Sequence, residues 1–201
     1  MFNSGVTVSE LIESINMEAD ISYDIPDESY VSWLNSLEQL LYREVIKEQG
    51  SVEVEPNGKV VIGLTGIKDA QGEDELRFED IHAVYADGTQ LIKSTLASGV
   101  IFDNTYYKIS GGMGLNLKNP MPEKIKIVYF VRPALKTKEN KEADHVMLPI
   151  EFIDLAKAKL RAEAYKIANE DNLAAKWLND YNVLVETFKA WIEGKNAKFG
   201  L

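Results

Sequence analysis

The apolar residues of this sequence change their spacing twice along the chain, and this change limits the folds that it can adopt. From residue 7 to about residue 49 they recur every three or four residues, which is the spacing of one helix face, and the same spacing returns from 149 to 192. Between about 50 and 135, apolar and polar residues alternate as they do along β-strands. We therefore predict an α+β protein.

Two helices are expected in the N-terminal part. Thr7 or Ser9 caps the first, and a short extended segment at 21–25 follows it. Pro26 opens the second helix and Gly50 marks its end. The expected apolar face of the first helix is Val8, Leu11, Ile12 and Ile15. The expected stripe of the second is Tyr30, Trp33, Leu34, Leu37, Leu41 and Val45.

A second pair of helices is expected near the C-terminus. Pro149 lies at the first turn of one helix, residues 169–171 interrupt the pattern, and Gly194 ends the last helix. The two stripes are Phe152, Leu155, Ala156, Leu160, Ala164 and Ile167, then Leu173, Trp177, Tyr181, Leu184, Phe188 and Trp191. Because every stripe has to be buried, we expect the N-terminal pair to pack against the C-terminal pair.

Turn signals divide the middle of the chain into short strands. Pro56-Asn57-Gly58, Ala86-Asp87-Gly88 and Gly111-Gly112 each predict a hairpin. The hairpins join 52–54 to 59–64, 78–85 to 89–94, and 106–110 to 113–117. The clearest strand is 124–132, in which Ile125, Ile127, Tyr129 and Val131 alternate with the other residues. Six to eight such strands predict a small antiparallel sandwich or barrel.

These patterns predict two domains, one inserted into the other. Residues 1–49 and 136–201 form one helical domain, and 50–135 form the inserted antiparallel β domain. The charged stretch 137–144 is expected to be a linker. No run of 18 apolar residues occurs and no signal peptide is evident, so we expect neither a membrane span nor secretion.

The formal net charge of −10 is unevenly distributed, and it argues against general binding to nucleic acid or anionic membranes. No Lys or Arg precedes Arg43. The acids before it are Glu10, Glu13, Glu18, Asp20, Asp24, Asp27, Glu28 and Glu38. This stretch predicts a solvated acidic surface, or alternatively a surface that faces a basic partner or lines a passage for DNA.

The residue types that usually carry catalysis do not form a recognisable constellation. The chain has no cysteine, and neither His82 nor His145 has a second histidine three or four residues away. The glycines of 110–114 lack the spacing and lysine of a phosphate-binding loop, and the acids of 73–75 and 79–80 lack a calcium-loop pattern. We expect no enzymatic activity, no cofactor and no metal site.

The last residues differ in sign from the N-terminal helices. Lys195, Lys198 and Phe199 follow the expected helix end, in a tail that closes with Leu201. A short basic tail with an aromatic residue can dock into a groove on a partner, although such ends are often frayed. The opposite charges of the two ends permit head-to-tail contact between identical subunits.

The helical parts resemble a known family. Three parts of the C-terminal region are similar to the closing helices of head-to-tail adaptor (connector or neck) proteins of tailed bacteriophages. They are the helix start Leu148-Pro149-Ile150-Glu151-Phe152, the alanine-rich stretch 156–168 and the aromatic-bearing stretch 172–192. The segment 21–45 is similar to the opening helices of that family, and the middle of the chain to the inserted β domain of the podophage-type adaptors.

The resemblance implies a non-enzymatic virion protein, made in the host cytoplasm and located at the head–tail junction. Such proteins form a ring, commonly twelve-fold, beneath the portal, extend the DNA channel without binding DNA specifically, and offer a surface to the tail or nozzle protein. The resemblance would place the tail residues Lys195, Lys198, Phe199 and Leu201 on the portal. It would place helix or ring contacts at Phe152, Leu160, Trp177, Tyr181, Phe188 and Trp191.

Other interpretations stay open. The β domain could be a carbohydrate- or ligand-binding module with helical support, with exposed aromatics from the set Tyr85, Tyr106, Tyr107 and Tyr129. The chain could also be another tail-completion or tail-terminator protein. An enzyme would need a pocket around His82 or His145 with a nearby carboxylate.

Overall fold

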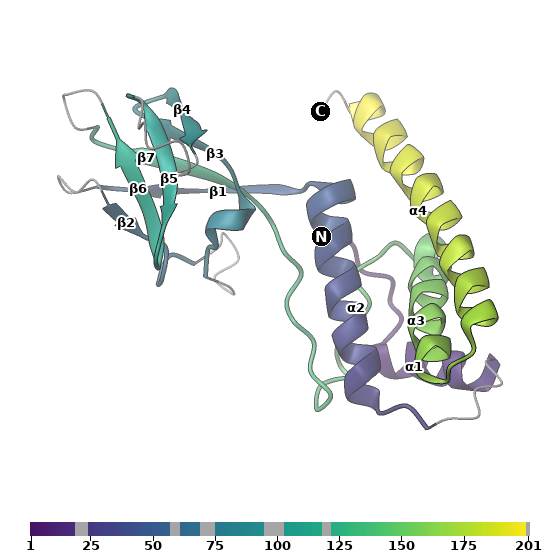
Figure 1. The fold of residues 1–201 in the computed structure, drawn as a ribbon. Helices are drawn as coiled ribbons and strands as arrows, with labels where there is room; N and C mark the ends of the chain where they lie inside the picture. The colour runs from purple at the N-terminus through teal and green to yellow at the C-terminus, as the bar shows by residue number, and fades with distance from the viewer. Residues whose placement is uncertain (19–23, 57–60, 69–74, 95–102, 118–121, 200–201) are drawn as a thin grey trace. The chain divides into compact units, whose positions relative to one another are not determined.

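The chain combines helices with one seven-stranded sheet, which confirms the α+β prediction with an inserted β domain. A computed structural model describes residues 1–18, 24–56, 61–68, 75–94, 103–117 and 122–199 (Figure 1). It divides into two compact units: Met1–Ile46 with Leu135–Leu201, and Lys47–Ala134. We call these the helical unit and the β unit. Both chain ends belong to the helical unit.

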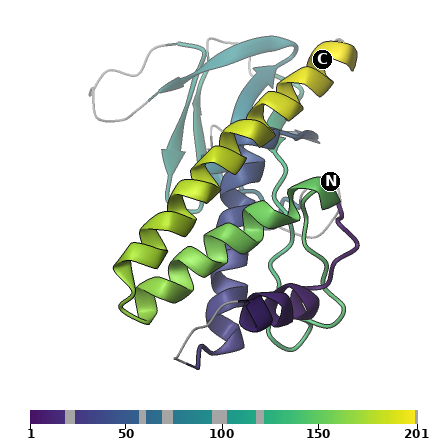
Figure 2. The ribbon, with the colours of Figure 1, turned by 90° about the vertical axis from the view of Figure 1, so that its right-hand side faces the viewer.

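The helical unit contains four α-helices. They are α1 (Val8–Glu18), α2 (Asp27–Leu41), α3 (Ile153–Ile167) and α4 (Asp171–Phe199). A π-helical turn, Tyr42–Ile46, continues α2, and a 3-10 turn, Ile150–Phe152, precedes α3. Helices α3 and α4 lie side by side in Figures 1 and 2, and α2 packs on α3. The apolar stripes from both ends of the chain meet in one core, as expected.

The start of α1 shows how local chemistry fixes a helix end. The hydroxyl of Thr7 accepts a hydrogen bond from the Glu10 amide at 3.1 Å, and the Glu10 carboxylate accepts one from the Thr7 amide at 2.8 Å. This reciprocal pair is a capping box, so Thr7 is the cap. The same contacts with Thr7 lower the pKa of Glu10.

The second helix ends earlier than expected. The π-helical turn closes at Ile46, and Lys47 then takes a left-handed conformation (φ 54°). Gly50 therefore does not end the helix, as the sequence had predicted, but lies in strand β1 (Gln49–Val54). A Cβ at Gly50 would lie 2.7 Å from the Tyr129 ring, so the glycine permits a close contact between strands.

The last helix continues beyond its expected end. Gly194 lies inside α4, which runs to Phe199, so the prediction that Gly194 ends the helix is wrong. Glycine terminates a helix when it adopts a left-handed conformation, and Gly194 does not. Lys195 lies over the ring of Trp191 across this turn, which helps the helix to continue past the glycine.

The β unit is a single curled sheet with the order β1-β7-β3-β4-β5-β6-β2. The remaining strands are β2 (Val61–Gly63), β3 (Ile81–Ala86), β4 (Thr89–Ser94), β5 (Thr105–Ile109), β6 (Gly112–Asn116) and β7 (Ile125–Phe130). Strands β4 and β5 pair in parallel and the other neighbours antiparallel, so the expected all-antiparallel sheet is in fact mixed.

Two of the three predicted hairpins are confirmed. Asp87 (φ 44°) and Gly88 (φ 83°) connect β3 to β4, and Gly111 (φ 71°) connects β5 to β6. The first predicted hairpin is wrong, because β1 pairs with β7 and β2 pairs with β6. The two strands lie at opposite ends of the sheet order, and residues 57–60 between them lie outside the described residues.

Strand β7 is the centre of the β unit's core. Ile125, Ile127 and Tyr129 are buried on one face, as their alternation predicts, together with side chains from the neighbouring strands. At the end of this strand Arg132 forms a largely buried ion pair with Asp80 (2.7 Å). The β unit therefore has a core of its own.

Candidate functional site

The residues that could have supported catalysis do not come together. His82 is exposed on β3, with its ring 4.9 Å from that of Phe130, and His145 forms an isolated β-bridge with Thr7 in the other unit. Glu79 pairs with Lys108. Among the described residues, no group of three His, Asp or Glu could hold a metal ion. Glu73 and Asp74 lie outside the described residues.

The residues predicted to form helix or ring contacts lie in or against the core of the helical unit. Phe152, Leu160, Tyr181 and Phe188 are buried, and Trp177 and Trp191 are partly buried against them. The rings of Phe152 and Phe188 are 4.7 Å apart, and those of Phe152 and Trp191 are 5.3 Å apart. Their contacts are therefore between helices of one chain, and the fully buried Leu160 and Phe188 have no surface to offer to another subunit.

The predicted tail begins within the last turns of α4. Lys195 is exposed, and its Nζ lies 3.7 Å from the ring centre of Trp191 and 5.6 Å from that of Phe2. Lys198 and Phe199 close the helix, and Leu201 lies outside the described residues. The tail therefore starts as a helix that is anchored through Lys195, and not as a frayed end.

The N-terminal acids are less available than the sequence predicted. Of the seven that the structure describes, four pair with bases that follow the β unit in the sequence. Glu18 pairs with Lys157 and Arg161, Asp27 with Lys141, Glu28 with Lys138, and Glu38 with Lys136. These pairs join the two chain segments of the helical unit. The acidic excess is thus partly neutralised inside the unit, which leaves less of it for a partner or for a DNA passage.

The charged stretch 137–144 is a loop, but it belongs to the helical unit, so the expectation that it is a linker is wrong. Asn35 binds the start of the segment 135–144 through two hydrogen bonds. Its side-chain amide donates one to the Lys136 carbonyl and accepts one from the Lys136 backbone amide, both at 2.9 Å. Lys136 and Glu38 form a buried ion pair, and Glu38 also accepts a hydrogen bond from the Met147 amide at 2.7 Å. Burial raises the pKa of Glu38, against the opposing effect of Lys136.

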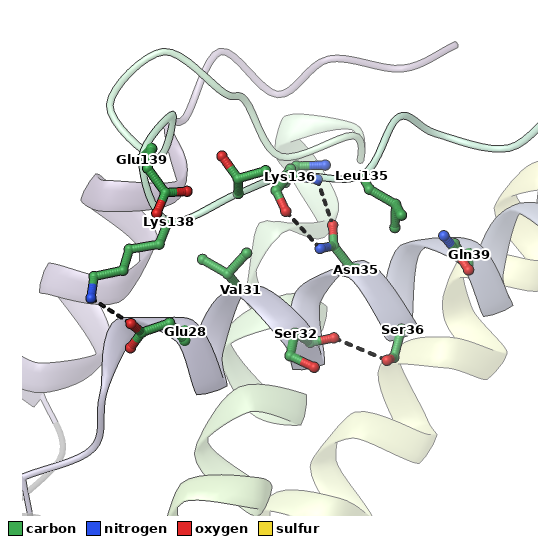
Figure 3. A pocket seen from close by; sticks show the side chains of 11 residues that line it. Glu28, Val31, Ser32, Asn35, Ser36, Gln39, Leu135, Lys136, Lys138 and Glu139 are labelled. Carbon is green, nitrogen blue, oxygen red and sulfur yellow. Dashed lines mark hydrogen bonds and ion pairs between the residues drawn. The ribbon is translucent and has the colours of Figure 1, made fainter. Parts of the chain in front are cut away.

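A cavity of about 450 Å³ lies between α2 and the segment 135–139 (Figure 3). Figure 3 shows the Asn35–Lys136 bonds on one side of it and the Lys138–Glu28 pair at one end. Its α2 side presents Ser32, Ser36 and Gln39, and Leu135 is half-exposed beside them. This lining can form hydrogen bonds with a polar ligand or a peptide.

A second cavity, of about 540 Å³, lies where the end of α1 meets α3 and α4. Arg161 pairs with Glu18 and lies 4.6 Å from the ring centre of Trp177, while Lys157 lies 3.3 Å from Glu18. Hydrogen bonds from Arg161, then Ser14 and Lys157, lower the pKa of Glu18 to about 2. The carboxylates of Asp154 and Asp180 line the same cavity.

The β unit holds a smaller cavity of about 390 Å³ beside the β3–β4 turn. Tyr85 lines it with Glu53 and Lys126, which are register neighbours across β1, β7 and β3. The other tyrosines considered for ligand binding are placed differently. Tyr106 and Tyr129 are buried in the core, and the ring of Tyr107 packs over Gly114.

The most specific polar arrangement, Glu38 with Lys136, was missed by the sequence reasoning. The sequence did contain an indication of this pair. Glu38 lies four residues after Leu34 and three residues before Leu41, within the apolar stripe of α2. An acid at such a position has to find a buried partner. The sequence did not indicate that this partner would be Lys136, which follows the β unit in the sequence.

Comparison with known proteins gives no family. No protein-family model matches the chain, and the search of curated proteins found no relative. Within the described parts of the chain, no helix has both the length and the apolar character needed to cross a membrane.

Proposed function

We propose that the chain is a virion structural protein of a tailed bacteriophage, a head-to-tail adaptor that forms a ring beneath the portal. The observation that carries the proposal is the layout: both ends of the chain fold into one helical unit around an inserted β unit. This is the layout of the adaptor family that the terminal helices resemble in sequence. The adaptor would extend the DNA channel and present a surface to the tail or nozzle protein.

The proposed contacts use α4. Its last turns, with Lys195, Lys198 and Phe199, and the residue Leu201 beyond it would dock on the portal. Ring contacts would come from the outer surfaces of α3 and α4, because the aromatic residues of their stripes are engaged inside the unit. A net charge of −10 favours the passage of DNA without sticking.

The experiment is assembly of the full chain with the portal protein of the same phage, followed by mass measurement and electron microscopy of the mixture. We expect a ring on the portal, and we expect Lys195→Ala with Lys198→Ala to weaken it. The matched control is Lys189→Ala on the same helix, where the lysine pairs with Glu186. A chain that stays monomeric and free of the portal at all concentrations would contradict the proposal.

A second candidate is a ligand-binding β unit, favoured by the Tyr85 cavity. A half-buried tyrosine beside a lysine and a carboxylate can stack on a sugar ring and bond its hydroxyls. A glycan-array screen of the full chain and of Tyr85→Ala tests it. Glycan binding that is lost in the variant would support this function, and no binding would remove it.

A further inference from the structure

Helix α4 carries a second stripe beside its buried face, and Asp180 and Val183 of this stripe also line the cavity where α1 meets α3 and α4. The buried residues Ala174, Tyr181 and Phe188 recur every seven positions. The second stripe follows alternating spacings of three and four residues, and it is exposed or half-exposed throughout. It consists of Leu173, Lys176, Asp180, Val183, Thr187 and Ala190. In Figure 2, α4 crosses in front of α2.

The stripe has features of a contact surface. Leu173 is 37% exposed and Val183 is 60% exposed, although both are large aliphatic side chains. Lys176 and Asp180 lie between them, and neither forms an ion pair with any residue that the structure describes. Apolar residues at a repeat averaging 3.5 residues let one helix pack along another, and Leu173, Val183 and Ala190 are the apolar residues of this stripe.

The stripe is also complementary to itself. Leu173 and Val183 lie five residues before and after position 178, and Lys176 and Asp180 lie two residues before and after it. If two copies of α4 run antiparallel about this position, Leu173 of each faces Val183 of the other. Lys176 of each then faces Asp180 of the other, so two apolar and two opposite-charge contacts form together.

We propose that a second copy of this chain docks on this stripe, giving a two-fold dimer through antiparallel α4 helices. A two-fold contact is complete with two copies, so it differs from the contact that would build a ring. The overlapping stretch of 15 residues, 171–185, spans roughly 22 Å of helix. Within one helix, a lysine four residues before an acid is the less favourable order, so these charges gain more from the second copy.

The test is sedimentation equilibrium of the full chain and of charge variants. We expect a dimer for the unmodified chain, and about a tenfold or greater loss of affinity for Lys176→Glu and for Asp180→Lys, because each variant places like charges opposite one another. The double variant Lys176→Glu with Asp180→Lys should dimerise again.

The mixing experiment is more specific to the antiparallel register. Lys176→Glu and Asp180→Lys should each be monomeric alone but should pair with each other, since both contacts between the two variants then join opposite charges. Val183→Asp should also abolish the dimer. The control is Asn182→Lys, an exposed position of α4 outside the stripe, which should leave the dimer unchanged.

Circular dichroism of each variant shows whether the fold is retained; these positions are exposed or half-exposed, so we expect it to be. A monomeric unmodified chain at the highest soluble concentration would overturn the proposal. Failure of the two single variants to pair, or a dimer that is lost in Asn182→Lys, would overturn it as well. None of these results depends on binding to the portal, so the proposed adaptor function is tested separately.

Discussion

The two units of this protein are built in opposite ways. The helical unit joins two segments that are separated by the whole β unit, Met1–Ile46 and Leu135–Leu201. The β unit is one continuous stretch, held by ladders between strands and by its own core around β7. In the helical unit, specific polar pairs connect the segments, and the buried pair of Glu38 and Lys136 is the clearest of them.

The difference indicates where each unit is vulnerable. A unit made of two distant segments depends on the contacts between those segments, since no short connection holds them together. The stability of a sheet formed by one continuous stretch of chain depends on how closely its neighbouring strands can pack. The following predictions test this contrast, beginning with the largest expected effect.

Lys136→Met should destabilise the helical unit by about 3–5 kcal/mol, because it leaves the Glu38 carboxylate buried without its cation. All three tryptophans, Trp33, Trp177 and Trp191, belong to the helical unit, so tryptophan fluorescence during urea unfolding reports on that unit. The double variant Glu38→Met with Lys136→Met should recover most of the loss. A single variant as stable as the unmodified chain would show that the pair is not needed.

Gly112→Ala should destabilise the β unit by about 1–3 kcal/mol, through crowding between β6 and β2. The added Cβ would lie 2.4 Å from the carbonyl oxygen of Ile62, which is backbone and cannot rotate away. Gly63→Ala is the matched control, since no atom lies within 4 Å of its Cβ position. Chemical unfolding followed by far-ultraviolet circular dichroism measures both, and equal losses in the two variants would contradict this explanation.

Thr7→Ala should cost about 1 kcal/mol, because the Glu10 amide loses its acceptor at the start of α1. Thr7→Ser keeps the hydroxyl and should retain most of the stability. Tryptophan fluorescence during urea unfolding again gives the measurement. If the serine variant loses as much as the alanine variant, the threonine acts through its methyl group and not as a cap.

Glu18→Gln should have the smallest effect, and its effect should depend on pH. Folding lowers the pKa of Glu18 from 4.5 to about 2, so the ionised carboxylate stabilises the fold above pH 4.5. This contribution is lost as the pH falls from 4.5 to about 2, where the variant and the unmodified chain should become equally stable. Glu13→Gln, at an exposed position on the same helix, is the matched control and should change the stability less than Glu18→Gln at neutral pH.

The sequence predicted those features that depend on nearby residues. Two hairpins followed from the turns at Asp87-Gly88 and Gly111, since turn geometry is decided within a few positions. The pairing of β1 with β7 joins residues such as Val54 and Ile125, and no local pattern carries that information. The turn signal at Pro56 indicated a reversal of the chain but could not indicate which strand β1 would join.

The same limit applies to the candidate surfaces. Helical spacing correctly showed that one face of α4 is buried, but it could not distinguish a partner helix of the same chain from one of another subunit. Phe188 and Leu160 were therefore predicted as contacts of either kind, and the structure places them in the chain's own core. The pairing of N-terminal acids with later lysines was also beyond the sequence, because it depends on which segments fold together.

The split construction of the helical unit has a consequence for biosynthesis. The apolar faces of α1 and α2 leave the ribosome long before α3 and α4, which cover them, have been translated. At ordinary elongation rates this interval is on the order of ten seconds. The β unit, by contrast, is complete as soon as residue 134 emerges. During synthesis we therefore expect the β unit to fold first, while the apolar faces of α1 and α2 stay exposed and prone to aggregation until α3 and α4 have been made.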